Sequence, residues 1–391
     1  MSLPSSRMWC YQAFSSFSYY MFINPHSNIL TDLPNMNESW KCNNETVASG
    51  LCHGLSICGW CYDYGEARIV SKEYETFNSI VISFLLPSIG FFGILGNGLS
   101  AFIYSRKEMI SSLNMYLCAL ACSDIIIILT AFFLFFMESM RRRSEAMTYY
   151  FAVLSPVMFP LGLTAQTLSV FITVASAFDC LILVAASQKV RHRLCSVNTS
   201  ILILLIIVCI AFIYNSPHMF EIYVVDCWSM PYGAVSKDVC PTALRSNPDY
   251  LTIYYAYLYT IVMAAGPVSL LVVINSAIVV SMKRNKREEQ NDSDILTLVL
   301  VVCLFISCNV LPLTVNFLEL LFEVVNAYLI DLSNLMVVVN SSCNFLIYYA
   351  FGSNFRRTLR HYFINLVGGR RTGRFPQFTV DFVSTPPEVL I

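Results

Sequence analysis

Between Leu194 and Phe220 the chain reads LCSVNTSILILLIIVCIAFIYNSPHMF, a run of 27 residues that contains no Asp, Glu, Lys or Arg. A helix needs about 20 apolar residues to cross the hydrocarbon core of a bilayer, so this stretch is long enough to span a membrane. Its apolar residues form a continuous block and do not alternate with polar ones, which argues against a strand of a membrane β-barrel. The stretch therefore predicts a transmembrane helix.

Six further stretches are equally long and poor in charge. Together the seven predicted spans are Thr76–Ser105, Met109–Ser123 continuing past Asp124 to Met137, Ala146–Phe178, Leu194–Phe220, Tyr250–Met282, Ile295–Leu318 and Leu332–Phe355. The composition agrees, because hydrophobic residues make up 56% of the 391 residues and charged residues only 13%, against about a quarter in soluble domains. This excludes a disordered chain and argues against a nucleic-acid-binding protein. We expect an all-α membrane protein, a seven-transmembrane helix bundle.

The distribution of charge predicts the orientation of the bundle. With the N-terminus outside, 15 Lys and Arg fall on the inner side and nine on the outer side, whereas 16 acids lie outside and seven inside. Cytoplasmic loops are enriched in Lys and Arg, so the N-terminus is predicted to lie outside the plasma membrane, although Arg141–Arg143 opposes this bias. Glycosylation sequons at Asn37 and Asn44 agree. No cleavable signal peptide is evident, so the first span is expected to act as the signal anchor.

Seven of the 15 cysteines fall on the predicted outer side: Cys10, Cys42, Cys52, Cys58, Cys61, Cys227 and Cys240. An oxidising exterior favours disulfide bonds between them, but the pairing of an odd number of cysteines cannot be deduced from spacing. The other eight lie in the spans or at their inner ends, where cysteine is usually a small buried apolar residue.

Several motifs match the signatures of rhodopsin-like G protein-coupled receptors. Gly96-Asn97 lies in the first span and LACSD (Leu120–Asp124) in the second. The seventh span contains NSSCNFLIY (Asn340–Tyr348), which is similar to the Asn-Pro-x-x-Tyr motif of that class with Phe345 in place of the proline. The chain then has an amphipathic pattern typical of a short interfacial helix, with apolar residues at Phe355, Leu359, Phe363 and Leu366 beside Arg356, Arg357 and Arg360. The resemblance implies a short cytoplasmic amphipathic eighth helix in contact with membrane lipids.

Within that class, the chain resembles the FMRFamide-like neuropeptide receptors of invertebrates, nematodes above all. The motifs that carry this resemblance are Pro160…Thr164–Ser169, Tyr214–Glu221, Cys240–Tyr250 and Asn340–Ser342 with Asn344-Phe345. The resemblance covers about residues 77–367, and it implies an extracellular segment at 1–76, a receptor domain at 77–351, the amphipathic helix at 352–367 and a cytoplasmic tail at 368–391. It also implies an amidated peptide and a heterotrimeric G protein as partners, with no enzymatic activity.

The resemblance implies a ligand that ends in an amidated Arg-Phe. A pocket for it should offer acids for the guanidinium and aromatic or apolar walls for the Phe, and the outer excess of acids would steer a cationic peptide inward. The residues expected to contact the ligand are Gln166, Glu221, Tyr255, Tyr259, Glu319 and Asn334.

Asp124 is the one acid deep inside a span, and an intramembrane carboxylate predicts a functional site. The resemblance places four polar residues around it: Ser169, Asn340, Ser341 and Asn344. One carboxylate with neutral oxygens suits an allosteric sodium ion, and the alternative is a hydrogen-bonded network around a protonated Asp124. No other cofactor is expected.

The chain departs from the class at the inner end of the third span. Asp179-Cys180-Leu181 stands where the class has Asp-Arg-Tyr, although Tyr348 is kept, so the signalling residues Asp179, Cys180 and Tyr348 predict atypical G protein coupling. Ser155 occupies the place of the usual outer cysteine of the third helix. A Cys227–Cys240 bridge, or a bridge from that loop to the N-terminal segment, is expected to replace the common one.

Two alternatives remain. A nematode chemosensory seven-helix receptor, with atypical or absent G protein coupling, would share the same fold. A transporter or channel is disfavoured by the single intramembrane acid and the lack of inverted halves, and an enzyme by the lack of catalytic motifs. At the C-terminus, Val389–Ile391 can enter a PDZ groove as an added strand.

Overall fold

The structure, a computed structural model, describes residues 55, 56, 58, 71–141, 144–229, 233–284, 289–322 and 326–367, without the side chains of residues 256, 289–294, 319–321 and 365–367. The sequons at Asn37 and Asn44, the predicted tail at 368–391 and the PDZ motif Val389–Ile391 lie outside these ranges.

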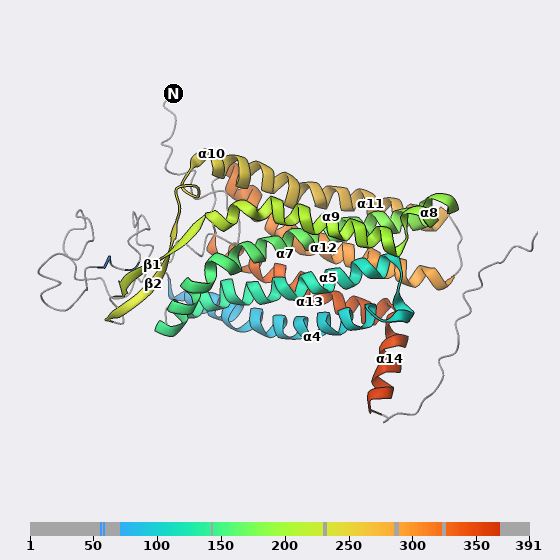
Figure 1. The fold of residues 1–391 in the computed structure, drawn as a ribbon, viewed down its shortest axis with the longest axis horizontal. Helices are drawn as coiled ribbons and strands as arrows, with labels where there is room; N and C mark the ends of the chain where they lie inside the picture. Colours follow the sequence, from blue (N-terminus) through green and yellow to red (C-terminus); the bar gives the residue numbers. More distant parts are fainter. Residues whose placement is uncertain are drawn as a thin grey trace, which may run out of the picture.

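Seven helices within the described ranges are long and apolar enough to cross a membrane, which confirms the predicted seven-helix fold. They run side by side along the long axis of the molecule (Figure 1). Their bounds are Lys72–Tyr104, Ser112–Arg141, Glu145–Ala185, Val197–Phe220, Pro248–Arg284, Ile295–Leu318 and Ala327–Phe351.

Several spans join more than one helical element. The elements are α3 (Lys72–Asn78), a π-helix (Ser79–Leu85) and α4 (Leu86–Tyr104); a 3-10 helix (Lys107–Met109); α5 (Ser112–Ala131), a π-helix (Phe132–Met137) and α6 (Glu138–Arg141); α7 (Glu145–Ala185); α8 (Gln188–Leu194); α9 (Val197–Asn215) and a 3-10 helix (Ser216–Phe220); α10 (Pro248–Tyr250), a π-helix (Leu251–Ala265) and α11 (Gly266–Arg284); α12 (Glu289–Phe322); α13 (Ala327–Phe351); and α14 (Ser353–Val367).

The seventh helix shows why a lack of charged residues predicts the existence of a span better than it predicts where the span begins and ends. The charge pattern predicts a start at Leu332, but α13 starts at Ala327 because the side chain of Asn326 accepts hydrogen bonds from two backbone N–H groups of the first turn. Asp331 lies inside the helix and is buried. The helix stops at Phe351, before the predicted end.

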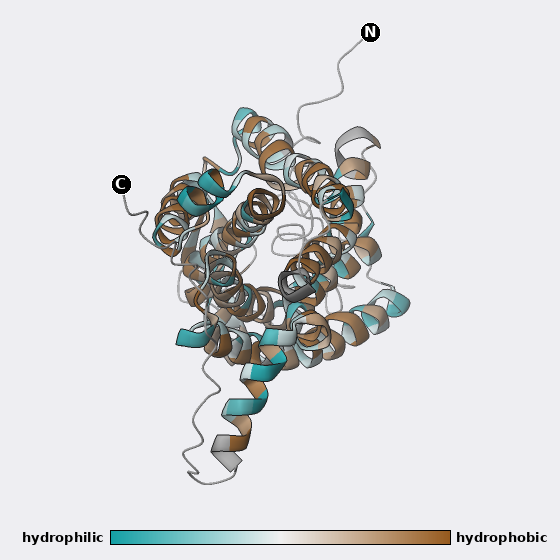
Figure 2. Ribbon diagram, turned by 90° about the vertical axis from the view of Figure 1, so that its right-hand side faces the viewer, coloured by the Kyte–Doolittle hydropathy of each residue, from teal (hydrophilic) through white to brown (hydrophobic). Residues whose placement is uncertain are grey.

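Apolar residues dominate the helices when the bundle is viewed along its length (Figure 2). Many large apolar side chains are exposed, such as Phe84, Phe92 and Ile213, and lipid is the solvent in which such a surface is stable. Buried polar side chains lie between the helices, among them Asn97, Asp124 and Thr167. The bundle is therefore apolar outside and holds its polar groups inside.

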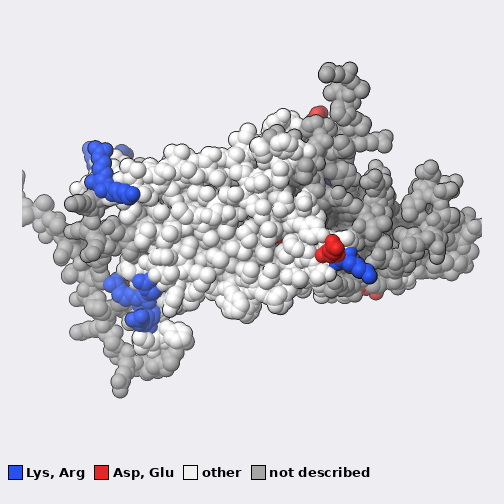
Figure 3. All heavy atoms as spheres, turned by 180° about the vertical axis from the view of Figure 1, so that it is seen from behind, with Lys and Arg blue, Asp and Glu red and all other residues white. Residues whose placement is uncertain are grey.

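Exposed charged residues gather at the two ends of the bundle. On the face seen in Figure 3, Lys and Arg gather at the end that carries α8 and α14, and the middle of the bundle is uncharged. The described bases in the loops and helix ends of this region are Arg106, Lys107, Lys189, Arg191, Arg193, Lys283, Arg284, Arg356, Arg357 and Arg360. We call this the basic end.

The opposite end carries a β-hairpin that the sequence analysis did not predict, and we call it the hairpin end. Strands β1 (Ile222–Ser229) and β2 (Ala234–Pro241) pair antiparallel beyond the fourth span (Figure 1). Ile222 and Val239 are buried in the same hydrophobic cluster as Phe151 of α7. The hairpin is therefore packed onto the third span.

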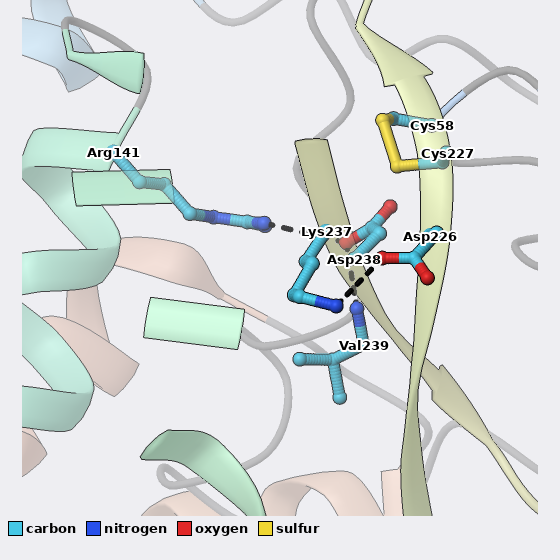
Figure 4. The surroundings of a disulfide bond; sticks show 7 residues. All are labelled: Cys58, Arg141, Asp226, Cys227, Lys237, Asp238 and Val239. Carbon is cyan, nitrogen blue, oxygen red and sulfur yellow. Dashed lines mark hydrogen bonds and ion pairs between the residues drawn. A yellow bond between two sulfur atoms is a disulfide. The ribbon is translucent and has the colours of Figure 1, made fainter. Parts of the chain in front are cut away.

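A disulfide bond ties the hairpin to the N-terminal segment (Figure 4). Cys58 is bonded to Cys227, with their Cα atoms 4.9 Å apart. The backbone N–H of Cys58 donates to the carbonyl of Trp228 at 3.0 Å, and the N–H of Trp228 donates to the carbonyl of Ser56 at 2.8 Å. Ser56 and Cys58 thus lie beside β1.

Of the two predicted alternatives for the hairpin cysteines, the Cys227–Cys240 bridge does not form. Cys240 lies opposite Tyr223 in the hairpin, four residues from Cys227 along β1, or about 13 Å at the usual rise of a strand. A disulfide needs Cα atoms about 4.4–6.8 Å apart. Cys240 is itself disulfide-bonded, but to a cysteine other than Cys227.

The amphipathic helix α14 leaves the bundle at the basic end, where the sequence predicts it (Figure 1). Phe355 is buried against the bundle, while Phe363 and Ile364 are exposed. The guanidinium of Arg106 lies 3.9 Å from the ring centroid of Phe102 and 5.6 Å from that of Tyr362, and these contacts join α14 to the end of α4.

Glycines allow α4 to approach α13 closely. A Cβ atom on Gly93 would lie 2.7 Å from Cβ of Ser342 and 2.8 Å from Cδ1 of Ile128. At the same seam, Asn97 Nδ2 donates to the carbonyl of Ser341 at 2.7 Å. The first and seventh spans are therefore in contact at a place where even one methyl group does not fit.

We predict that Gly93→Ala lowers the free energy of unfolding of the purified protein by about 1–3 kcal/mol, the usual cost of overpacking a well-packed interface. The matched control is Gly98→Ala on the same helix, because a Cβ there meets nothing within 4 Å and Ala is the better helix former. Thermal unfolding in detergent measures both. A Gly93→Ala protein as stable as the control would contradict the close contact.

Candidate functional site

A cavity of about 80 Å³ lies between the helices. Its lining comes from α5, α7, α9 with the following 3-10 helix, the π-helix before α11, α12 and α13. The lining residues are Ile127, Leu163, Gln166, Thr167, Ser169, Val170, Tyr214, Asn215, His218, Tyr255, Tyr259, Met263, Phe305, Cys308, Asn309, Pro312, Ser333, Asn334, Met336, Val337, Asn340 and Ser341. None of them is Asp, Glu, Lys or Arg, so the cavity suits an uncharged group with polar and apolar parts.

Four of the six residues expected to contact a ligand line this cavity, namely Gln166, Tyr255, Tyr259 and Asn334. They come from three separate helices, which are far apart in the sequence and meet only in the fold. Glu319 lies in α12, and its side chain is outside the described residues. Glu221 is placed differently and does not line the cavity.

Glu221 is the centre of a buried cluster at the hairpin end, with 0% of the residue exposed. Its Oε1 accepts hydrogen bonds from the hydroxyl of Tyr250 at 2.7 Å, from the hydroxyl of Tyr255, and from Nδ1 of His218 at 2.8 Å. Its Oε2 accepts from Arg245 Nη1 at 2.5 Å. His218 and Tyr255 also line the cavity, so they stand between this carboxylate and the cavity.

The cluster keeps Glu221 ionised. Burial alone raises the pKa of a carboxyl group, but the hydrogen bond and charge of His218 and the charge of Arg245 outweigh it and lower the pKa of Glu221 to about 2. An ionised carboxylate can only accept hydrogen bonds, so Nδ1 of His218 carries the hydrogen in their contact. The negative charge of Glu221 is therefore balanced within the chain, by Arg245.

Sequence reasoning selected Glu221 and missed three of its partners, namely His218, Tyr250 and Arg245. The spacing of His218 and Glu221 was an available signal, because residues three apart in a helical turn can face one another. Arg245 lies 24 residues further along and reaches Glu221 only because the hairpin brings the chain back. No local pattern could have predicted that pair.

Asp124 lies deep in the bundle between three helices and is 0% exposed. Asn344 Nδ2 donates to its Oδ2 at 2.8 Å, and Ser169 Oγ donates to its Oδ1 at 3.4 Å. Ser341 and Asn340, the other two predicted members of this site, line the cavity next to Ser169. Within the described residues the hydroxyl of Ser341 has no hydrogen-bond partner.

The signalling residues lie at the basic end. The hydroxyl of Ser112, at the start of α5, donates to Asp179 Oδ2 at 2.6 Å, so the second and third spans are joined there. Cys180 is 0% exposed and belongs to the hydrophobic core. Tyr348 is also buried, and its ring packs edge-on against Tyr104 with centroids 5.2 Å apart.

Comparison with known protein families gives one match that covers most of the chain. Residues 83–365 match the family described as "Serpentine type 7TM GPCR chemoreceptor Srw". This range contains all seven of the long apolar helices except the first turns of the first one.

Three relatives are similar to the chain over most of its length. It is 66% identical to "Probable G-protein coupled receptor frpr-1" of Caenorhabditis elegans, over 90% of this chain and 96% of that protein. It is 32% identical to "FMRFamide receptor" of Drosophila melanogaster, over 71% of this chain and 52% of that protein. It is 30% identical to "FMRFamide peptide receptor frpr-18" of C. elegans, over 68% and 65%.

We predict that Glu221→Gln destabilises the protein by about 3 kcal/mol at neutral pH. This is the free energy equivalent to lowering a carboxyl pKa from 4.5 to about 2. The substitution also removes the ion pair with the half-buried Arg245. Because the folded-state pKa is depressed, the stabilisation is complete above pH 4.5 and is lost as the pH falls toward 2. The difference in unfolding temperature between the two proteins should therefore shrink between pH 5 and pH 3.

The matched control is Asp226→Asn, which removes an exposed ion pair to Lys237 and should change stability by less than about 1 kcal/mol. A Glu221→Gln protein with the unfolding temperature of the wild type, or a difference that does not depend on pH, would contradict the role of the cluster.

Proposed function

Because the chain belongs to the serpentine seven-transmembrane family of G protein-coupled receptors, we propose that it is a receptor for an extracellular FMRFamide-like neuropeptide and signals by rearranging its helices. The observation that carries this proposal is the uncharged cavity near the hairpin end, which combines amide side chains with tyrosine rings. The names of two relatives support the same class of ligand. A receptor of this kind needs no enzymatic activity, and we propose none.

The chain is a multi-pass plasma membrane protein, and its N-terminus lies outside in our proposal. The excess of Lys and Arg at the basic end (Figure 3) supports this orientation, since cytoplasmic loops carry that excess. The hairpin end and the Cys58–Cys227 bridge then face the oxidising exterior, where disulfides persist. The division into segments 1–76, 77–351, 352–367 and 368–391 follows from this orientation.

The six residues predicted to contact the ligand have different roles in this proposal. Gln166, Tyr255, Tyr259 and Asn334 contact the ligand directly. Glu221 acts through His218 and Tyr255, which its carboxylate holds in place. Glu319, in the last turns of α12, is the proposed acid for the arginine of the peptide.

The proposed intracellular partner is a heterotrimeric G protein with atypical coupling. Cys180 stands where the class has an arginine, but it is uncharged and buried in the core. The neighbouring Asp179 accepts a hydrogen bond from Ser112. The name of the matching family favours a second candidate, a chemosensory receptor. A peptide ligand distinguishes the two.

Asp124 is the proposed site of an allosteric sodium ion. Ser169 is within hydrogen-bond reach of its carboxylate and Ser341 has an unpartnered hydroxyl among the described residues, so the oxygen ligands that a hard cation prefers are present. Asn340 and Asn344 complete the proposed set. When bound, the ion would supply positive charge that stabilises the ionised form of Asp124.

Three further features stay proposals. The sequons at Asn37 and Asn44 would carry glycans on the outer segment, and Val389–Ile391 would bind a PDZ domain. The exposed apolar residues of α14, Phe363 and Ile364, would contact membrane lipids beside the arginines of the helix.

A screen of amidated peptides against the full-length receptor, with a calcium or cyclic-AMP readout, tests the proposed function. At least one peptide that ends in Arg-Phe-amide is expected to activate it, and volatile or other small-molecule odorants are not. Cells that express the Gln166→Leu variant should need at least about tenfold more peptide, the usual loss when a buried polar contact is removed. Activation by odorants alone would favour the chemosensory reading.

We also predict that Ser112→Ala raises ligand-independent nucleotide exchange up to about tenfold, because it removes a hydrogen bond to a charged group that joins α5 to α7. The matched control is Ser123→Ala, a buried serine of the same helix whose hydroxyl bonds only to the carbonyl of Leu120 within the described residues. Unchanged exchange at equal surface expression would show that the Ser112–Asp179 bond does not restrain the basic end.

A further inference from the structure

The cavity has the chemistry of a carboxamide site. None of its lining residues is Asp, Glu, Lys or Arg, and five of its side chains are amides: Gln166, Asn215, Asn309, Asn334 and Asn340. A charged ligand group would find no Asp, Glu, Lys or Arg there, and burying an unpaired charge is far more costly than burying a hydrogen-bonded neutral group. The group that enters is therefore neutral and polar.

Asn334 differs from two other amides of the lining, Asn215 and Asn309. It is 1% exposed, and within the described residues neither its Nδ2 nor its Oδ1 has a hydrogen-bond partner. By contrast, Asn215 Nδ2 donates to Thr167 Oγ1 at 2.9 Å, and Asn309 Nδ2 donates to the carbonyl of Phe305 at 2.7 Å. Buried donors and acceptors are costly when unpaired, so Asn334 can offer one donor and one acceptor to a ligand at no loss of an internal bond.

Two more polar groups of the same lining are unpartnered among the described residues. They are the hydroxyl of Tyr214 and the hydroxyl of Ser341. Each can donate one hydrogen bond and accept another. The cavity thus has several polar groups that a neutral ligand can satisfy.

We propose that Asn334 binds the C-terminal primary carboxamide of the peptide ligand, an inference that rests on the proposed function. A primary carboxamide carries an acceptor oxygen and two N–H donors, as does the side chain of Asn. The two groups can therefore form a reciprocal pair, in which Nδ2–H donates to the ligand oxygen and the ligand N–H donates to Oδ1. Asn334 is the residue that selects an amidated C-terminus over an ester or a free acid.

The cavity is large enough for the carboxamide of the ligand but not for the aromatic ring of its C-terminal Phe. A cavity of about 150 Å³ holds a benzene ring, and this one has about 80 Å³. A carboxamide fits, whereas the ring of a C-terminal Phe stays nearer the hairpin end, beside Tyr255. The preceding Arg of the ligand lies farther out still, because the described residues of the lining include no acid for it and Glu221 is already bonded to Arg245.

The C-terminal chemistry of the ligand gives a direct measure of this pairing. A methyl ester keeps the acceptor oxygen and loses both donors, and it stays neutral. A free acid adds a negative charge for which the lining has no Lys or Arg. The ester is the sharper probe, because it changes hydrogen bonding without changing charge.

The experiment measures the binding of N-acetyl-Arg-Phe-amide, its methyl ester and its free acid to the purified full-length receptor by thermal-shift titration. The wild type is expected to bind the amide at least about tenfold tighter than the ester. In Asn334→Ala the amide should bind no more than about threefold tighter than the ester. A double-mutant cycle gives this result when the two groups that are changed, here Asn334 and the ligand carboxamide, are in contact. Asn334→Ser serves as a second variant should the alanine protein not fold.

The matched control is Asn316→Ala. Asn316 is also buried and its Oδ1 is also unpartnered among the described residues, but it does not line the cavity. Its variant should keep the amide-to-ester ratio of the wild type. The proposal is overturned if the wild type binds amide and ester equally, if neither dipeptide stabilises it, or if the ratio survives in both Asn334 variants.

A separate arm distinguishes this inference from the proposed function. Nucleotide exchange is measured with G protein and the same dipeptides. Exchange driven equally by amide and ester overturns the Asn334 pairing and supports the receptor function. Binding that prefers the amide through Asn334, without exchange on any G protein, supports the pairing and overturns the signalling half of the proposed function.

Discussion

The absence of water from the bilayer core is the constraint on which the rest of this structure depends. Backbone N–H and C=O groups there must be satisfied within the chain, which leaves helices as the spanning element for continuous apolar runs. Polar side chains can then be satisfied only where helices face one another. Asn334, Asp124 and Asp179 lie between helices in this way, and the Glu221 cluster lies at the hairpin end, just beyond the fourth span.

The Glu221 cluster limits which ligand groups the cavity can bind. A buried carboxylate needs a counter-ion, and removing one partner of such a pair costs more than the pair contributes. Arg245 supplies that counter-ion from within the chain, and His218 and Tyr255 cover the carboxylate on the cavity side. A ligand cation would have to displace Arg245 to gain from this acid. Among the described residues the cavity lining contains no Asp, Glu, Lys or Arg. In our proposal it therefore takes the neutral carboxamide of the ligand, and the ring and the arginine of the ligand lie nearer the hairpin end.

The sequence predicts the helices, which depend on local composition. It does not predict the contacts that form because the hairpin turns the chain back on itself. Hydropathy is local, so the seven spans could be read directly, and the resemblance to a receptor family selected four residues that line the cavity. The hairpin could not be read in the same way, because its strands are short and lie between two long helices. The Cys58–Cys227 bond and the Glu221–Arg245 pair both depend on that hairpin. They join residues that share no local pattern, and only the fold brings them together.

One face of α13 connects the cavity with the rest of the polar interior. Asn334, Ser341, Asn344 and Tyr348 follow one another at intervals of seven, three and four residues, which is the spacing of a single helix face. Asn334 and Ser341 line the cavity, Asn344 donates to Asp124, and Tyr348 is buried toward the basic end. A packed helix moves as a unit, since interiors are close-packed and do not deform continuously. A ligand group held at Asn334, as we propose, would therefore act on the same rigid helix that donates to Asp124, and α13 would connect the cavity physically with the basic end.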